Sequence, residues 1–534
     1  MKIIVVAISI ALSLSSYVFC QNVSIQSTAE VSNPDPQNFW TQNLGSDESG
    51  YYLIREIGPI TNPQIILEKY DLNLNLLFEK NIESSSGILG DSKRHFQTIL
   101  GNQELLVFLT SWNKEKSESG LWIKRMSVEG EPVGEEIQLL TNKSESLFKS
   151  SDYKVAISPD GSKFTVLTEP VFDKKATETF KMSVFNTSDL KKITEKNFDF
   201  SLEMERYPKN QVFVSNNGIA FAFKEAKISS KEFKYYLTSL SSSNSYLQEL
   251  NLKENRLNQF RFLINTDGIL VGFGLLADIK KYTTQWQNIW QIEAGVNGIL
   301  TDRIEPLGAA LLSKVIGEKK ASKDGAALNN FLFKDVIENP KGGYLLITEE
   351  LNESKTAVPG QTGTNTIYDY QLNFGGILVI SYNKSNNREW GSFYDKKQKI
   401  KTKNPNLSLG SFAYGIVENK LHMVWNYTEL EYVITFPKPH WIDKSGNKIA
   451  VMDVFGEEAR YPTFLTSINL DDGVFSYSER TFSSFPLKDI QRENNFMMSA
   501  DPSIFFSTPK SIIILSRMTD EFPKKIKFST ISFD

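Results

Sequence analysis

Few residues of this sequence carry side chains that could do acid–base, nucleophilic or metal chemistry. The 534-residue chain has three histidines, His95, His422 and His440, and a single cysteine, Cys20. None of the histidines begins an HExxH motif, and the chain contains neither a GxSxG nucleophile elbow nor a Walker Gly-Lys pair. His95 and His422 stand in strand-like runs, where we expect structural roles. The sequence therefore predicts no catalytic residue, no metal site and no cofactor.

One segment combines aromatic and hydrogen-bonding side chains. The stretch PKPHWIDKSG contains His440, Trp441 and Asp443, and Phe436 comes just before it. A flat aromatic ring beside polar groups is a surface on which a sugar or a peptide can stack. The alternative is that Trp441 and Phe436 pack this segment onto the fold while His440 and Asp443 lie in a turn.

This segment belongs to one of two long insertions in the repeat described below. The insertions span 351–375, which contains Tyr368 and Tyr370, and 426–462. Each interrupts its unit between the second and third predicted strands, and the two units are adjacent, so we expect the insertions to meet. Long loops on a rigid scaffold commonly carry binding sites. A third departure, at 308–327, is predicted to be a short helix.

The elements that must position these residues are hairpins. In VAISPDGSKFTVLTEP (155–170) two apolar runs flank Pro159-Asp160-Gly161, which supplies a fixed φ and a glycine free to adopt positive φ. The stretches 212–223, 262–273 and 335–350 repeat this plan with Gly in the turn. Weaker versions lie at 43–56, 96–110, 411–425 and 502–516.

A second hairpin follows each of these, so that a unit holds four short strands. Units recur at roughly 50 residues, close to the size of a propeller blade. We count eight units and keep seven, with one irregular unit, as the alternative. The eighth ends after its third strand, and the segment 22–31 has the strand character needed to pair with 525–533 and close the ring. Trp286 and Trp290 are expected to pack between units.

The turn ISPDGSKF (157–164) resembles the signature hairpin of TolB-like and WD-type β-propeller repeats, in which Asp-Gly joins the first two strands of a blade. The other units share the layout of this one more than its letters, so the resemblance concerns the fold and names no specific family. It implies an all-β fold, a closed β-propeller of four-stranded antiparallel blades. Such a fold hosts unrelated functions, so the function must be argued from a site.

Composition is consistent with one repeat domain over 21–534. The net charge of −4 gives no general attraction to nucleic acid or an anionic membrane. Residues 1–20, with Lys2 before an apolar core, read as a signal peptide cleaved between Cys20 and Gln21. We therefore expect a secreted or periplasmic protein, with a lipoprotein acylated at Cys20 as the alternative. No later segment is apolar enough to span a membrane.

Two classes of function remain open. The first is an exported, non-enzymatic and monomeric platform that binds a protein, peptide or glycan through Trp441, His440, Asp443, Phe436, Tyr368 and Tyr370. The second is a secreted hydrolase or lyase acting on a polysaccharide or peptide, with His440 as acid or base and Asp443 or Glu457 nearby. The first is favoured because no catalytic constellation can be assembled from the sequence.

Overall fold

A computed structural model describes most of the chain. The residues described are 23–27, 31–32, 40–57, 64–82, 93–144, 152–229, 232–253, 255–278, 285–357, 368–402, 410–426, 431–433, 440–442, 448–449, 463–482, 498–518 and 525–533. The predicted signal peptide lies outside them. Within these ranges no helix has the length and apolar character that a membrane crossing requires.

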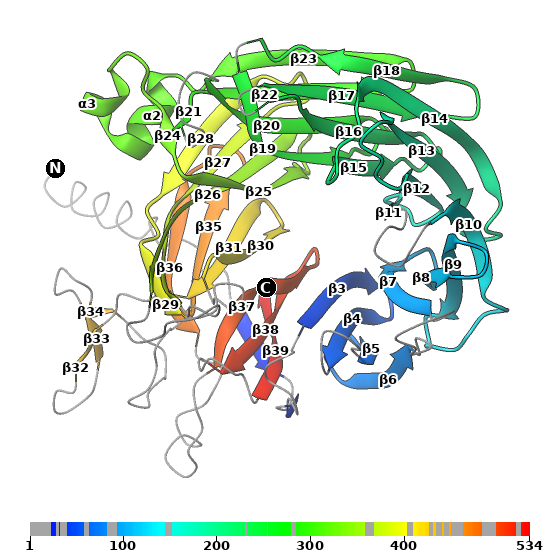
Figure 1. The fold of residues 1–534 in the computed structure, drawn as a ribbon. Coiled ribbons are helices and arrows are strands. Elements are labelled where there is room, and N and C mark those ends of the chain that lie inside the picture. Colours follow the sequence, from blue (N-terminus) through cyan, green and yellow to red (C-terminus); the bar gives the residue numbers. More distant parts are fainter. Residues whose placement is uncertain are drawn as a thin grey trace, which may run out of the picture. The chain divides into compact units, whose positions relative to one another are not determined.

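Most of the described strands form a series of four- and five-stranded antiparallel sheets, in most of which strands that follow one another in the chain are neighbours (Figure 1). The chain divides into two compact units, of which the larger spans 33–411 with 470–475. In this unit sheet 1 comprises β3 (Trp40–Asp47), β4 (Gly50–Ile57), β5 (Gln64–Tyr70) and β6 (Leu76–Ile82). Sheet 2 comprises β7 (Lys93–Leu100), β8 (Glu104–Asn113), β9 (Glu118–Ser127) and β10 (Ile137–Lys143). Sheet 3 comprises β11 (Asp152–Ile157), β12 (Lys163–Glu169), β13 (Thr177–Asn186) and β14 (Lys192–Glu203). Sheet 4 comprises β15 (Lys209–Val214), β16 (Ala220–Lys227), β17 (Phe233–Leu240) and β18 (Ser245–Leu250). Sheet 5 comprises β19 (Asn255–Ile264), β20 (Leu270–Asp278), β22 (Asn288–Gly295) and β23 (Gly298–Pro306). Sheet 6 comprises β25 (Phe331–Glu338), β26 (Tyr344–Ala357), β27 (Tyr368–Tyr382), β28 (Arg388–Tyr394) and β29 (Gln398–Thr402).

The predicted turns make the first hairpin of each sheet. At Pro159-Asp160-Gly161 the Asp160 carboxylate accepts hydrogen bonds from the Ser158 hydroxyl at 2.6 Å and the Ser162 amide at 2.9 Å, and Gly161 has a φ of 70°. The turns at Gly218 and Gly268 have φ of 75° and 78°. Because positive φ costs glycine little, these positions fix where each strand reverses.

The second strand of each sheet is covered on both faces, as its continuous apolar sequence predicts. Every residue of β20 before Asp278 is buried, and so are all residues of β16 before Lys227. Neighbouring sheets of the larger unit share apolar clusters, each of which joins one sheet to the next in chain order. Trp290 lies in the cluster between sheets 4 and 5 and Trp286 in the cluster between sheets 5 and 6, both buried, as the sequence analysis predicted.

The smaller unit contains two such sheets and the chain's amino-terminal strands. Sheet 7 comprises β30 (Phe412–Val417), β31 (Lys420–Asn426), β35 (Thr463–Asn469) and β36 (Phe475–Phe482), and sheet 8 comprises β37 (Met498–Ser507), β38 (Ser511–Met518), β39 (Lys525–Phe533), β1 (Val23–Ser27) and β2 (Val31–Ser32). β1 pairs antiparallel with β39 from Val23 opposite Phe533 to Ser27 opposite Ser529. The predicted pairing of 22–31 with 525–533 is therefore present.

The three insertions contain regular structure. Residues 308–327 hold α2 (Ala309–Ile316) and α3 (Glu318–Ala321), flanked by β21 (Gln285–Trp286), which pairs with β24 (Leu328–Asn329). Much of 351–375 is strand instead of an open loop, because β26 and β27 remain paired out to Ala357 opposite Tyr368. The alternation of Tyr368, Tyr370 and Leu372 with polar residues is a strand pattern that the sequence analysis passed over. The insertion 426–462 contains β32 (Glu431–Val433), β33 (His440–Ile442) and β34 (Lys448–Ile449).

Candidate functional site

The structure describes only part of the cluster predicted in the insertion 426–462. His440 and Trp441 lie in β33, where Trp441 pairs with Tyr432 of β32 and with Ile449 of β34. Phe436 and Asp443 lie outside the described residues, as do the side chains of His440 and Trp441. The binding role of these four residues therefore stays a prediction.

Tyr368 and Tyr370 lie next to each other on the extended part of β27. Their ring centroids are 6.3 Å apart, and the Lys355 ammonium of β26 lies 4.8 Å from the Tyr368 ring centroid. Both tyrosines are partly buried. The pair is thus held on a strand pairing, where its rings are partly covered, and its role in binding a ligand stays a prediction as well.

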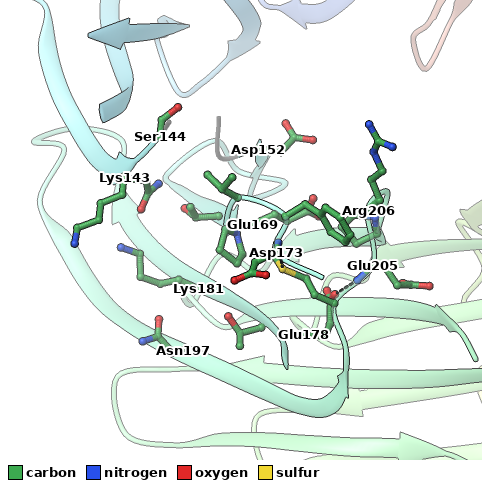
Figure 2. Close-up of a pocket in the computed structure, with 18 of the residues that line it drawn as sticks. Lys143, Ser144, Asp152, Glu169, Asp173, Glu178, Lys181, Asn197, Glu205 and Arg206 are labelled. Carbon is green, nitrogen blue, oxygen red and sulfur yellow. Dashed lines mark hydrogen bonds between the residues drawn. The ribbon is translucent and has the colours of Figure 1, made fainter. Parts of the chain in front are cut away.

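A large hollow among the described residues lies elsewhere, at one end of sheet 3, with a volume of about 1660 Å³ (Figure 2). The end strand of sheet 2 borders it through residues 142–144, and sheet 3 borders it through the ends of β12, β13 and β14. Residues 116–118 of sheet 2, Asp152, the connection 170–174 and the link 204–208 to sheet 4 complete its lining. We call this hollow the sheet 3 groove. The groove lies at the end of sheet 3 where the connection between the second and third strands, β12 and β13, emerges. The insertions predicted to bind a ligand interrupt their units at the equivalent connection.

Strand alternation makes one wall of the sheet 3 groove polar. In β13 Phe180, Met182 and Val184 join the apolar cluster shared with sheet 4, so Thr179 and Lys181 point to the opposite face, toward sheet 2. Lys181 is directly opposite Thr168 of β12 and Asn197 of β14, which makes a row of three polar side chains across the sheet. Thr168 is 3% exposed, and its hydroxyl has no hydrogen-bond partner among the described residues.

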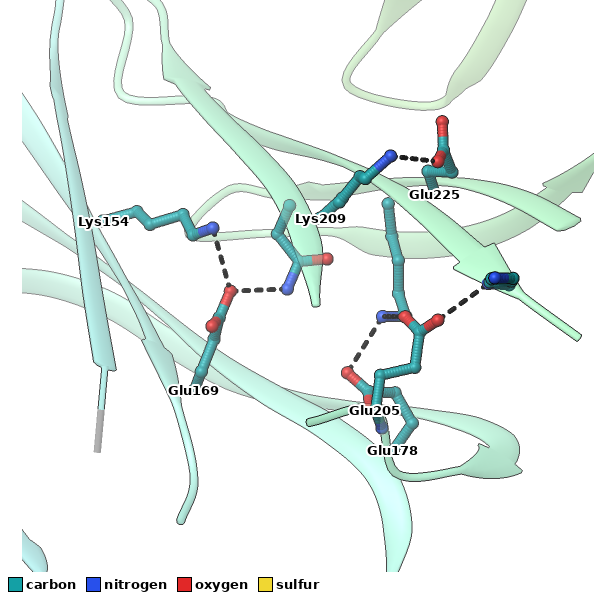
Figure 3. Close-up of polar contacts among 9 residues, drawn as sticks. Lys154, Glu169, Glu178, Glu205, Lys209 and Glu225 are labelled. Atoms are coloured by element: carbon teal, nitrogen blue, oxygen red, sulfur yellow. Dashed lines mark hydrogen bonds and ion pairs between the residues drawn. The ribbon is translucent and has the colours of Figure 1, made fainter. Parts of the chain in front are cut away.

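A buried ion cluster fixes the link 204–208 at the edge of the groove (Figure 3). The Lys224 ammonium lies 2.9 Å from Glu178 Oε1 and 3.3 Å from Glu205 Oε2, and the side chains of Lys224 and Glu178 are at most 3% exposed. The Glu205 amide donates to Glu178 Oε2 at 2.8 Å, and Glu205 Oε1 accepts from the Lys227 amide at 2.8 Å. Met204 donates its amide to the Ala176 carbonyl at 3.2 Å, which ties the link to sheet 3.

A second buried carboxylate lines the groove at the end of β12. Glu169 Oε1 accepts a hydrogen bond from Asn210 Nδ2 at 2.7 Å and lies 3.3 Å from the Lys154 ammonium (Figure 3). Burial raises the pKa of Glu169 above its ordinary value, against the opposing effect of Lys154. Glu169 is thus a carboxyl group whose protonation is favoured more than that of an exposed glutamate.

Two aromatic side chains are exposed at the rim. Tyr207, in the link to sheet 4, is 81% exposed, and Phe172, in the connection between β12 and β13, is 41% exposed. The Arg206 guanidinium lies 5.5 Å from the Tyr207 ring centroid. An exposed tyrosine ring beside a polar groove is a surface on which a ligand can stack.

The sequence analysis missed this site, although part of its signal was available. In TETFKMSV the residues Thr179, Lys181 and Ser183 alternate with Phe180, Met182 and Val184, which indicates a strand with one polar face inside a repeat where both faces are normally covered. The connection EPVFDKKAT and the link MERYP, each with one aromatic residue, were the other signal.

No metal site accompanies the groove. Across the parts of the chain that the structure describes, no group of three or more His, Cys, Asp or Glu side chains is arranged to hold a metal ion. The buried carboxylates Glu169 and Glu178 that line the groove are ion-paired with Lys154 and Lys224 instead. A protonated lysine is not a metal ligand.

Repeated four-stranded antiparallel meanders that pack on one another through shared apolar clusters define a protein of β-propeller type, without a specific family. No protein-family model matches the sequence, and no curated protein matches it either.

Among solved structures the chain is similar to the β-propeller domain of the trilobed protease from Pyrococcus furiosus, with a TM-score of 0.35, 8% identity and coverage of 82% of this chain and 97% of that chain. It is also similar to the polysaccharide lyase Uly1, with a TM-score of 0.33, 9% identity and coverage of 85% and 93%. For an endo-arabinase from Bacteroides thetaiotaomicron the values are 0.25, 11%, 53% and 97%. Scores this low carry no argument about function.

Proposed function

We propose that this chain is an exported binding platform and that the sheet 3 groove holds an extended, polar ligand. The observation that carries the proposal is the groove itself, whose volume of about 1660 Å³ exceeds the roughly 300–1,000 Å³ of sites for single small molecules. A segment of a polymer fits such a space better than a metabolite does. Polar side chains line it, and the exposed Tyr207 provides a stacking face at its rim.

The arrangement supports binding more than catalysis. Glu178 and Glu205 are joined to Lys224, and Glu169 is joined to Lys154, so three of the carboxylates that line the groove already have cationic partners. Most glycosidases use two carboxyl groups that flank the bond to be cleaved, one as an acid and the other as a base or a nucleophile. Carboxylates tied to lysines serve instead to fix the shape of the groove.

The eight sheets are proposed to be blades of one closed propeller. The support for closure is the pairing of β1 with β39, which lets the amino-terminal segment complete the last sheet. This pairing covers the backbone edge of β39 that would otherwise be exposed. Export is proposed from the signal-like residues 1–20.

The proposal is tested by screening the mature chain on glycan and peptide arrays beside two variants. We expect the arrays to identify a ligand that binds the wild type and the Leu300→Ala variant but does not bind the double variant Tyr207→Ala/Phe172→Ala. Leu300 is a matched control because it is 60% exposed and lies outside the groove. Retention of binding by the double variant would remove the groove from the account.

The insertion 426–462 is a second proposed surface, and the same screen separates it from the groove. Trp441→Ala should abolish binding if the cluster of His440, Trp441, Asp443 and Phe436 holds the ligand, and should leave binding unchanged if the sheet 3 groove does. The extended part of the β26–β27 hairpin, which carries Tyr368 and Tyr370, is tested in the same way with Tyr368→Ala and Tyr370→Ala.

A hydrolase or lyase that acts on a polysaccharide is the second candidate function, favoured by one observation. Glu169 lines the groove, and burial raises its pKa, a property of carboxyl groups that act as general acids. Release of new reducing or unsaturated ends from a polysaccharide by the wild-type chain, and loss of that release in Glu169→Gln, would favour this function over simple binding.

A further inference from the structure

We propose that the ligand of the sheet 3 groove is an uncharged oligosaccharide segment. This inference rests on the proposed function, because it names the chemical class of the ligand that the same groove holds. It is argued from the balance of charge, from the order of donors and acceptors along the wall and from the exposed rings.

The charges around the groove cancel. Two lysines from outside the lining, Lys154 and Lys224, are joined to its buried carboxylates. The cations of the lining are Lys116, Lys143, Lys174, Lys181 and Arg206, and its carboxylates are Glu118, Asp152, Glu169, Asp173, Glu178, Asp199 and Glu205. Five lining cations and the two outside lysines make seven, which equals the seven carboxylates. A polyanion or a polycation would find no net attraction here.

The exposed charges are also mixed along the groove instead of separated. Once the ion-paired Glu169, Glu178 and Glu205 are set aside, four carboxylates remain beside the five lining cations. Lys181 of β13 lies two residues from Thr179, which is directly opposite Asp199 of β14. A ligand that follows this wall meets a cation and a carboxylate within one or two residue spacings, about 7 Å.

This order of groups matches sugar hydroxyls. Thr168, Lys181 and Asn197 form one cross-strand row, and Thr179 and Asp199 form the next pair. The ammonium is a donor, the carboxylate an acceptor, and the threonine hydroxyl and asparagine amide are both. A sugar hydroxyl donates and accepts at once, so neighbouring hydroxyls can bond a donor and an acceptor in turn. The unpartnered hydroxyl of Thr168 adds a buried group for a ligand or a bridging water to satisfy.

The exposed rings supply the remaining contact. A pyranose ring has an apolar face of C–H groups that packs flat on an aromatic side chain, and Tyr207 exposes 81% of its surface for such a contact. The link that carries Tyr207 is held by the hydrogen bonds of Glu205 to Glu178 and Lys227. The backbone of the link is therefore held two residues from Tyr207 before a ligand arrives, which lowers the backbone entropy lost on binding.

A peptide is the less suitable occupant. Peptide recognition in grooves depends on apolar pockets for anchor side chains or on a free strand edge for backbone pairing. The wall of the sheet 3 groove presents polar side chains of β12, β13 and β14 in place of apolar pockets; β12 and β13 are paired on both edges, and of these three strands only β14 has an edge without a partner strand among the described residues.

The test is calorimetric titration of the mature chain with neutral hexasaccharides (cellohexaose, mannohexaose, maltohexaose, xylohexaose), a hexagalacturonate, a chitosan hexamer and mixed-sequence hexapeptides. We expect at least one neutral hexasaccharide to bind, with an affinity that changes less than about twofold between 50 and 300 mM NaCl because no net charge is neutralised. Tyr207→Ala should weaken binding by about tenfold or more. Lys181→Met and Asp199→Asn should each weaken it severalfold, and the Leu300→Ala control should not change it.

The outcomes separate this inference from the proposed function. If only a charged saccharide or a peptide binds and Tyr207→Ala removes that binding, the ligand class is wrong while the groove remains the site. If a neutral saccharide binds equally to wild type, Tyr207→Ala and Lys181→Met, both the inference and the assignment of the groove are wrong. Binding of none of the neutral hexasaccharides at 1 mM also overturns the inference.

Discussion

The ammonium of Lys224 lies 2.9 Å from Glu178 Oε1, and both side chains are almost completely buried between sheets 3 and 4. Glu205, which begins the link to Tyr207, shares the same ammonium at 3.3 Å. One buried cation therefore both joins two sheets and fixes the segment that carries the most exposed aromatic side chain of the groove. We therefore expect stability and ligand binding to be coupled at this residue.

Replacing Lys224 tests the contribution of this ion cluster to stability. Lys224→Met leaves the Glu178 carboxylate buried without its cation, so the free energy of unfolding should fall by about 3–5 kcal/mol in urea titrations. The double variant Lys224→Met/Glu178→Met removes the two most buried charges and should recover part of this loss, because Glu205 still loses its cation and the acceptor of its amide. The control is Lys234→Met, because Lys234 pairs with Glu249 at 3.2 Å on a surface where both side chains are more than one-third exposed. That variant should lose less than about 1 kcal/mol. Equal losses in the two single variants would contradict the account.

The turn of the first hairpin in sheet 3 gives a prediction about backbone geometry. Gly161 has a φ of 70°, and a Cβ at this position would approach the Asn102 amide nitrogen to 2.5 Å and the Gly101 carbonyl carbon to 2.8 Å. Gly161→Ala should therefore cost about 1 kcal/mol for the positive φ and a further 1–3 kcal/mol for the clash with backbone. Gly134, with a φ of 73° and no atom within 4 Å, is the matched control. Gly134→Ala should show the first cost alone in thermal denaturation, and similar losses in both variants would argue against this packing.

The hairpin at Gly161 was predictable from sequence because its determinants are local. Pro159-Asp160-Gly161 specifies a reversal whatever the rest of the chain does, and the apolar runs beside it specify buried strands. The pairing of 22–31 with 525–533 followed from counting strands in a repeat. The row of Thr168, Lys181 and Asn197 was not predicted, because it depends on register across three strands, and register is set by packing of the opposite face. Nor does sequence reveal that Glu205 and Lys224 meet, since they are 19 positions apart, with β15 and its turn between them.

The amino-terminal strand gives a prediction about closure. Deletion of residues 22–31 removes β1, which pairs with β39 over five residues from Val23 to Ser27. Loss of a complete edge strand exposes the backbone of β39, so the melting temperature should fall by several degrees, as expected for a loss of more than 1 kcal/mol in a large domain. Replacing 22–31 by a flexible segment of equal length keeps the chain length constant and should give the same fall. An unchanged melting temperature in both variants would show that this pairing does not stabilise the protein.

The buried histidine of sheet 7 gives a prediction about pH. His422 is 1% exposed, its Nδ1 lies 2.6 Å from the Ser467 hydroxyl, and burial lowers its pKa from 6.5 to about 4. Between these two values the unfolded chain binds a proton that the folded chain does not, so the stability contributed by this residue is present above pH 6.5 and is lost as the pH falls toward 4. The loss over this window should be about 3 kcal/mol.

The measurement is the difference in the free energy of unfolding between wild type and His422→Gln at pH 7 and at pH 4.5. Carboxylates titrate in both proteins and cancel in the comparison, so the wild type should lose about 2–3 kcal/mol more than the variant on acidification. Parallel pH profiles would show that His422 does not titrate as its burial requires.

The central claim is that the sheet 3 groove is where this protein holds its ligand, and hydroxyl-radical footprinting with and without a bound saccharide tests it most directly. Radical oxidation reports the solvent exposure of individual side chains, and Tyr207, Phe172 and Leu300 are all exposed in the free protein. The account predicts that a saturating ligand protects Tyr207 and Phe172 severalfold while Leu300 is oxidised at the same rate. Equal oxidation of Tyr207 in the free and the saturated protein would contradict the claim.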